Sequence, residues 1–182
     1  NEGSIASYVG GIGAHGGSGT IPPMQGFFIK ASGNFDFSLA AEARVHNNDQ
    51  FRYKKKSTSQ IHTAIDTIAF IRLKINSSVD STDLVVRFNN NATEGADKLY
   101  DAFVFGKQAG NVNIWTTAQG IAYSINGLPF PEATLELPVD INANVAGTYT
   151  FSLSGINRMG NYSIHLKDLV TGRTADLTNG ET

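Results

Sequence analysis

The sequence predicts an all-β protein, and three observations lead to that prediction. Apolar and polar residues alternate with a period of two in many segments, as strands with one buried face require. Glycine and asparagine separate these segments, and no window supports a helix of three turns. We therefore expect about eleven short strands packed as an antiparallel two-sheet β-sandwich, jelly-roll-like, with little or no helix.

The expected strands follow in order along the chain. A long glycine-rich loop at 10–19 precedes two candidates that are rich in aromatic residues, at 26–30 and 35–39. Alternating or β-branched segments then predict strands at 71–75, 84–88, 102–105, 112–115, 121–125, 135–137, 149–153 and 164–166. The end of the chain reads as a strand, a two-residue turn at Thr171-Gly172, a second strand and a turn at Asn179-Gly180. This hairpin is the clearest sign of antiparallel structure.

Size and composition restrict the class of protein. The chain has 182 residues, enough for one large domain with a full core, and we expect 1–182 to be a single β-sandwich module. Because it begins at Asn1 rather than Met, we expect it to be a processed or excised fragment of something longer. A net charge of -2 provides no field for nucleic acid, and no apolar run is long enough to span a membrane, so neither partner is expected. The absence of cysteine excludes disulfides and thiolate chemistry.

No motif in the chain indicates catalysis. Gly11-Ile-Gly-Ala-His-Gly16 matches a dinucleotide-binding fingerprint in letters, but glycine and proline follow in place of the helix that would hold the pyrophosphate. The four histidines are isolated from one another, no nucleophile elbow is present, and the carboxylates form no recognisable pair. We therefore expect no enzymatic activity, with a polysaccharide-active enzyme as the weakest alternative.

The loop at 89–101 is the best candidate for a metal site. Calcium prefers six to eight oxygen ligands, which Asn91, Glu94, Asp97 and Asp101 could supply. The spacing is not that of an EF-hand, so the alternative is a polar turn whose side chains cap the local backbone. A structural calcium ion is the one cofactor that the sequence suggests.

Aromatic residues suggest a carbohydrate-binding surface. Trp115, the only tryptophan, lies near Tyr123 across an expected hairpin at 116–120, and Tyr100 lies close to a loop. Sugar rings stack on exposed aromatic faces, so Trp115, Tyr123 and Tyr100 are candidate carbohydrate-binding residues. The alternative is that these rings belong to the core, as strand aromatics often do.

Several segments, in order, are similar to one known kind of module. They include Ile21-Pro-Pro-Met-Gln-Gly-Phe-Phe-Ile-Lys-Ala31, 43–46, 71–74, 86–88, 92–97, 100–102, 146–150 and 165–178. The chain resembles the β-rich region that precedes the C-terminal sorting domain in large proteins that Bacteroidetes export through the type IX secretion system. This resemblance implies a secreted or cell-surface location and a non-catalytic segment beside other domains of the parent protein.

The chain departs from that family pattern in two places. The family usually has an earlier segment containing Asn-Pro and a further strand after the last turn, and both are absent here, so the chain is either a trimmed fragment or borrows strands from a partner. We expect an accessory module that binds a polysaccharide or cell-surface glycan, or mediates adhesion. The alternative is a structural spacer that precedes a sorting domain and has no ligand.

Overall fold

The computed structural model describes residues 5–31, 33–45, 68–105, 111–156 and 159–178. These residues form eleven strands and one short 3-10 helix, η1 (Ala41–Ala43). The expectation of an all-β protein with about eleven strands and essentially no helix is confirmed.

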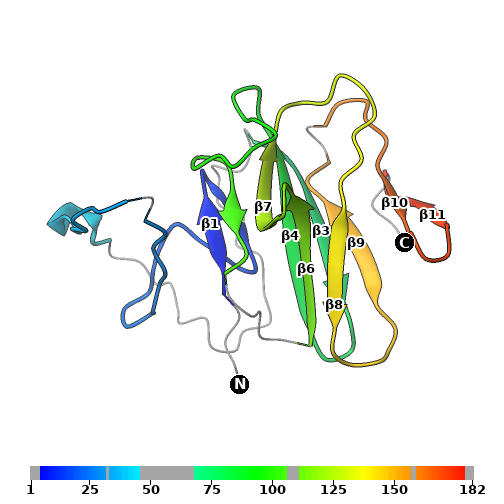
Figure 1. Ribbon diagram of the computed structural model, residues 1–182. Helices are drawn as coiled ribbons and strands as arrows, with labels where there is room; N and C mark the ends of the chain where they lie inside the picture. Colours follow the sequence, from blue (N-terminus) through cyan, green and yellow to red (C-terminus); the bar gives the residue numbers. More distant parts are fainter. Residues whose placement is uncertain (1–4, 32, 46–67, 106–110, 157–158, 179–182) are drawn as a thin grey trace.

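The strands form one seven-stranded sheet and two separate hairpins. The large sheet contains β3 (Ala69–Asn76), β4 (Ser81–Phe88), β5 (Ala102–Phe103), β6 (Val112–Ala118), β7 (Ile121–Leu128), β8 (Val139–Ala143) and β9 (Thr150–Ser154). The hairpins are β1 (Ser7–Val9) with β2 (Ile12–Ala14), and β10 (His165–Lys167) with β11 (Thr174–Asp176). The order in the sheet is β8-β6-β7-β4-β3-β9, with β5 paired to β7. The outer strands β8 and β9 lie on the same side of the central strands, so the sheet curls like half a barrel (Figure 1).

The large sheet is mixed, which corrects the expectation of purely antiparallel pairing. Strands β4 and β7 run parallel, with Val85 opposite Ile125 and Phe88 opposite Leu128, and the other pairs are antiparallel. Parallel neighbours need a long crossover, which residues 89–120 provide here. The finer expectation of a two-sheet sandwich stays a prediction, because the described strands form one large sheet with a hairpin on each face.

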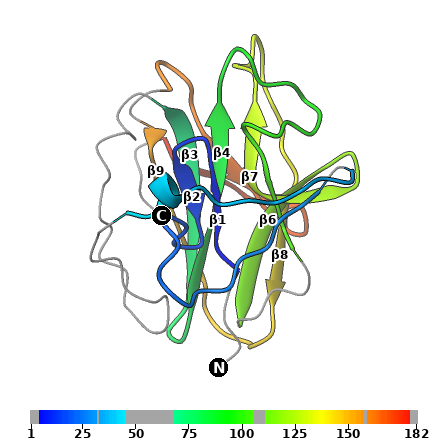
Figure 2. The ribbon, with the colours of Figure 1, turned by 90° about the vertical axis from the view of Figure 1, so that its left-hand side faces the viewer.

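Two apolar cores lie on opposite faces of the large sheet. In β4, Leu84, Val86 and Phe88 belong to the larger core and Val85 to the smaller one. The C-terminal hairpin lies beside the larger core, which Leu177 helps to close, and the β1–β2 hairpin covers the smaller core (Figures 1 and 2). Residues 84–88 of β4 are therefore buried on both faces, which explains why four of these five residues are apolar.

Three expected strands are not strands in the structure. Residues 26–30, 35–39 and 135–137 form no ladder with a neighbour. The first two segments instead leave large apolar side chains in solvent, and Phe28 is 70% exposed. Alternation in a sequence indicates that a segment could form a strand, but a strand also needs a partner edge for its backbone hydrogen bonds.

The glycine-rich segment is more ordered than the sequence predicts, and this is a further correction. The expected long loop at 10–19 contains β2 and the turn that joins it to β1. Gly10 and Gly11 have φ values of 50° and 92°, the conformation that a two-residue hairpin turn requires and that glycine adopts without strain. The glycines of the nucleotide-like fingerprint therefore shape a hairpin and precede no helix.

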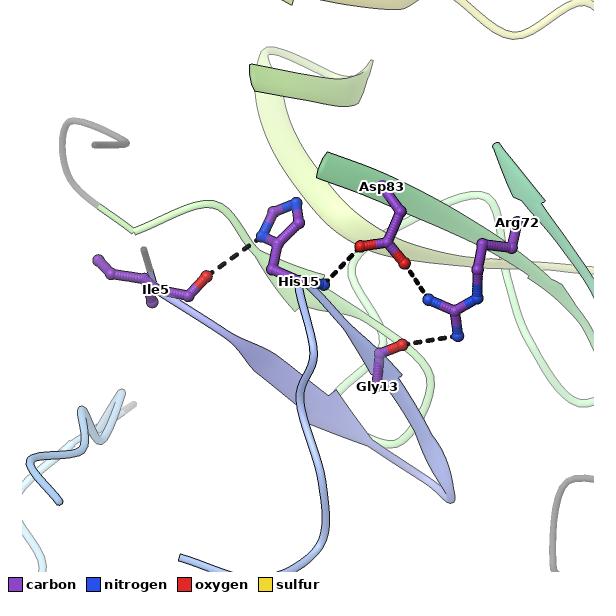
Figure 3. A network of polar contacts seen from close by, with 5 residues as sticks. All are labelled: Ile5, Gly13, His15, Arg72 and Asp83. Atoms are coloured by element: carbon purple, nitrogen blue, oxygen red, sulfur yellow. Dashed lines mark hydrogen bonds and ion pairs between the residues drawn. The ribbon is translucent and has the colours of Figure 1, made fainter. Parts of the chain in front are cut away.

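A polar network connects this hairpin to the large sheet (Figure 3). The carboxylate of Asp83 on β4 accepts hydrogen bonds from the Arg72 side chain and, at 2.8 Å, from the backbone N–H of His15. Arg72 also donates to the Gly13 carbonyl oxygen at 2.8 Å. Nδ1 of His15 lies 3.1 Å from the Ile5 carbonyl oxygen. One carboxylate thus joins β3, β4 and the hairpin.

The C-terminal hairpin was predicted correctly, but its turn is longer than expected. The Asp168 N–H donates to the Arg173 carbonyl oxygen at 2.8 Å, which encloses four residues rather than two. The Asp168 carboxylate holds this turn, because it accepts hydrogen bonds from the Val170 N–H and the Thr171 hydroxyl. The second turn expected at Asn179-Gly180 lies outside the described residues.

This turn allows a test by pH titration. The hydrogen bond from Thr171 lowers the pKa of Asp168 below its usual value. The ionised Asp168 carboxylate therefore stabilises the hairpin at pH values above the usual aspartate pKa. This stabilisation is lost as the pH falls through the lowered pKa. We expect Thr171→Val to move the Asp168 pKa back up, as measured by NMR of the carboxyl carbon. Asp176, whose pKa is lowered by Thr178, is the internal control. An unchanged Asp168 pKa would contradict the assignment.

Candidate binding site

The indole of Trp115 is half-buried and lies on β6. Its neighbours Val112 and Ile114 belong to the larger core, so strand alternation directs Trp115 to the opposite face of the large sheet. Asp140 of β8 lies directly opposite Trp115 in the ladder. Residues opposite each other in a ladder share a face, which places a carboxylate beside the indole.

Polar side chains lie on the same face of the sheet as this tryptophan. The Thr117 hydroxyl donates to the Asp140 carboxylate at 2.5 Å, which fixes that carboxylate on the sheet. Asn142, exposed on β8, lies two residues beyond Asp140 and therefore on the same face, opposite Asn113. The face thus combines an aromatic surface, a carboxylate acceptor and side-chain amides. We call Trp115, Thr117, Asp140 and Asn142 the Trp115 face.

Tyr123 does not extend this face. Its side chain is only 2% exposed, and its ring centroid lies 5.3 Å from that of Phe103. Burial raises the pKa of the phenol. Among the described residues, no aromatic contact joins Tyr123 to Trp115. The ring of Tyr123 therefore offers no free face to a sugar in this structure, and its role as a carbohydrate-binding residue stays a prediction.

Tyr100 is half-buried and lies against a cation. The Cζ atom of Arg87 is 4.9 Å from the centre of the Tyr100 ring. The backbone of Tyr100 also packs closely on Gly127 of β7. Tyr100 therefore covers Arg87, and whether it also contacts a ligand stays a prediction.

The acidic loop uses its carboxylates to hold its own backbone. Asp97 accepts hydrogen bonds from the N–H and the hydroxyl of Thr93, at 2.6 and 3.0 Å. Asp101 accepts from the N–H groups of Asp97 and Gly127, both at 2.6 Å. Burial raises the pKa of Asp101, and these two hydrogen bonds oppose that rise. The pattern matches the capped polar turn that was the alternative to a metal site.

The calcium site expected in this loop stays a prediction. Glu94 and Asn91 are exposed, and the Asn91 N–H donates to the Asn89 side chain at 2.9 Å. Within the described part of the chain, no three histidine, aspartate or glutamate side chains converge as metal ligands. Of the histidines, His165 is exposed on β10 as its position in the alternation predicts, and His46 and His62 lie outside the described residues.

Arg87, which no motif in the sequence singles out, lies among the buried residues of the structure at 7% exposure. The sequence does contain a signal for the burial of Arg87. The run Leu84-Val-Val-Arg-Phe88 alternates only weakly, which is typical of a strand buried on both faces, and a charged residue inside such a strand must also be buried. An arginine in that position needs an explanation of its own.

Comparison with known proteins adds a family but no activity. A family model described as "Domain of unknown function (DUF8693)" matches residues 1–181. No curated protein and no solved structure matches the chain significantly. Separately, none of the helical structure in the described residues is long and apolar enough to cross a bilayer.

Proposed function

The chain belongs to the family described as Domain of unknown function (DUF8693), and from its site we propose that it is a non-catalytic accessory module that binds a polysaccharide or other cell-surface glycan. The observation that carries this proposal is the Trp115 face, where a half-buried indole lies opposite Asp140 on the face of the large sheet that points away from the larger core. We further propose that the curled sheet, with a hairpin on each side, serves as the sandwich-like scaffold expected from the sequence.

The chemistry of the Trp115 face suits a sugar ring. A pyranose presents C–H groups on its flat sides and hydroxyls around its edge, so an indole packs on the side while polar groups bind the edge. The Asp140 carboxylate accepts hydrogen bonds from hydroxyls, and the Asn142 amide both donates and accepts. Neighbouring strands lie about 4.8 Å apart, which brings these groups within one sugar ring of Trp115. Residues on strands need little reordering on binding.

A binding role rather than catalysis is supported by the state of the carboxylates. Asp97 and Asp101 are engaged by backbone N–H groups. A glycoside hydrolase needs two carboxylates free to face one sugar, so a polysaccharide-active enzyme is the weaker alternative. We also propose that the protein is secreted or lies at the cell surface, beside other domains of a parent protein. The support for this is the family resemblance described above.

We expect the protein to be retained on at least one insoluble glycan in a pull-down and Trp115→Ala to lose most of that retention. Removing the aromatic centre of a binding surface commonly costs about 2 kcal/mol, or roughly thirtyfold in Kd. Tyr162→Ala, which removes an exposed aromatic ring outside β6 and β8, is the matched control and should be retained normally. Circular dichroism checks that both variants are folded.

Two results would contradict the proposal. Retention of Trp115→Ala equal to that of the unmutated protein would show that another surface binds the glycan. Failure of the unmutated protein to bind any glycan on a broad array would favour the alternative, a structural spacer that precedes a sorting domain.

A further inference from the structure

Segment 35–39 has the sequence of a strand but lacks a partner strand. Its apolar and polar residues alternate, as in a strand with one apolar face. Its apolar residues Phe35, Phe37 and Leu39 are 54%, 52% and 68% exposed. Among the described residues, no other backbone group forms a hydrogen bond with the backbone of this segment. The segment therefore has both an apolar face and backbone hydrogen-bonding groups available for a partner.

Strand β8 is an open edge of the large sheet. It pairs with β6 on one side, and no described strand pairs with its other side. Ile141 of β8 lies opposite Ile114 and so faces the larger core, yet Ile141 is 44% exposed. Lysine, proline or a β-bulge commonly protects such an edge, and β8 contains none of these. The larger core is therefore incompletely covered along β8.

Segment 35–39 and β8 lie on opposite sides of the molecule. The segment leads into η1, which projects on the left of Figure 1, whereas β8 lies on the right. In Figure 2, which is seen from that left side, this projecting part of the chain lies in front of the large sheet. The segment is therefore not beside the open edge of its own copy, but it is accessible to the edge of another copy.

We propose that segment 35–39 of one copy adds to β8 of a second copy as an antiparallel strand. Both elements are five residues long. With Phe37 opposite Ile141, the apolar side chains of the segment lie on the core face and cover Ile141. Backbone hydrogen bonds along the new ladder supply the affinity, as in other cases of strand addition. Because donor and edge lie on opposite sides of one copy, the assembly is head-to-tail and continues beyond a dimer.

Polar side chains favour the antiparallel direction. In that register Ser38 lies opposite Asp140 and Asp36 lies opposite Asn142, so a hydroxyl and an amide can each donate to a carboxylate. A parallel strand at the same position would place Asp36 opposite Asp140, and like charges directly opposite each other are destabilising. The added strand lies beside β8 rather than over the sheet, so Trp115 stays accessible and the proposed glycan binding is tested separately.

Sedimentation velocity tests the proposed assembly. We expect the unmutated protein to form species larger than a dimer as its concentration rises to about 1 mM. Phe37→Ser removes the centre of the donor, and Ile141→Lys places a charge on the core side of the edge, so each should weaken self-association at least about tenfold. Leu169→Ser, which changes an 84% exposed residue on another surface, is the control and should associate normally.

Mixing the two variants separates loss of binding from loss of folding. Phe37→Ser keeps an intact edge, and Ile141→Lys keeps an intact donor segment. An equimolar mixture should therefore form a 1:1 dimer and nothing larger, because only one matching donor and edge are present. Circular dichroism checks that each variant is folded before mixing.

A synthetic peptide of residues 33–41 tests the edge in the unmutated protein. We expect the peptide to dissociate the assembly and to shift the backbone amide NMR signals of β8 in a saturable manner. The same peptide with serine at positions 35 and 37 should do neither.

Four results would overturn the proposal. They are a protein that stays monomeric at about 1 mM, self-association that neither variant weakens, two folded variants that form no dimer when mixed, and peptide-induced shifts confined to strands other than β8. The peptide shifts do not depend on the folding of a variant.

Discussion

Replacing Ile125 by alanine is expected to lower the free energy of unfolding by about 3 kcal/mol, within the range of about 2 to 5 kcal/mol for truncating a large aliphatic side chain in a core. Ile125 is 0% exposed and belongs to the smaller core, between β7 and the N-terminal hairpin. Its strand pairs with β4 and β5 at this point, so the surroundings cannot close on the space left by the side chain.

Urea unfolding followed by tryptophan fluorescence measures this effect, since Trp115 is the only tryptophan. Val79→Ala is the matched control, because Val79 is 64% exposed and its truncation should change the stability by no more than about 0.5 kcal/mol. Equal stability losses in the two variants would contradict the position of Ile125 between the sheet and the hairpin.

Gly127→Ala is expected to destabilise the protein by about 3 kcal/mol, at the upper end of the usual cost of overpacking. A methyl group at this position would lie 2.4 Å from Cβ of Tyr100 and 3.0 Å from its carbonyl oxygen. The segment at Tyr100 and Asp101 would have to move away from β7, which would also strain the 2.6 Å hydrogen bond from the Gly127 N–H to Asp101.

Gly147→Ala is the control for this substitution, because no atom lies within 4 Å of the added methyl group there. Thermal unfolding should separate the two variants clearly, with the melting temperature of Gly147→Ala close to that of the unmutated protein. A tolerated alanine at Gly127 would mean that Tyr100 does not pack on β7. The cover over Arg87 would then be lost as well.

Most of the strands could be predicted because their residues alternate. The segments expected at 71–75, 112–115 and 121–125 became β3, β6 and β7, since a strand with a buried face leaves a period of two in the sequence. The segment at 35–39 alternates equally well, and the segment at 26–30 is rich in aromatic and β-branched residues, but neither forms a strand. Their composition favours strands. A strand also needs the edge of another strand beside it, and the position of that edge depends on distant residues, which the periodicity of a segment does not predict.

The candidate sites were predicted less completely than the strands. Trp115 keeps an accessible surface, as the carbohydrate hypothesis required, whereas Tyr123 packs against Phe103. In the sequence, both aromatic residues lie near the same expected hairpin. Which ring is covered depends on β5, which arrives from another part of the chain to pair with β7.

The sequence by itself determined that this protein is all-β, that it carries no recognisable catalytic motif, and that its turns lie at glycine and asparagine. These properties follow from local periodicity and local backbone preferences. Only the tertiary structure decided that β4 and β7 run parallel, that the two hairpins cover opposite faces, and that Arg87 is buried. The reason is physical: strand direction, burial on a second face and the pairing of a charge are set by contacts between residues far apart in the chain.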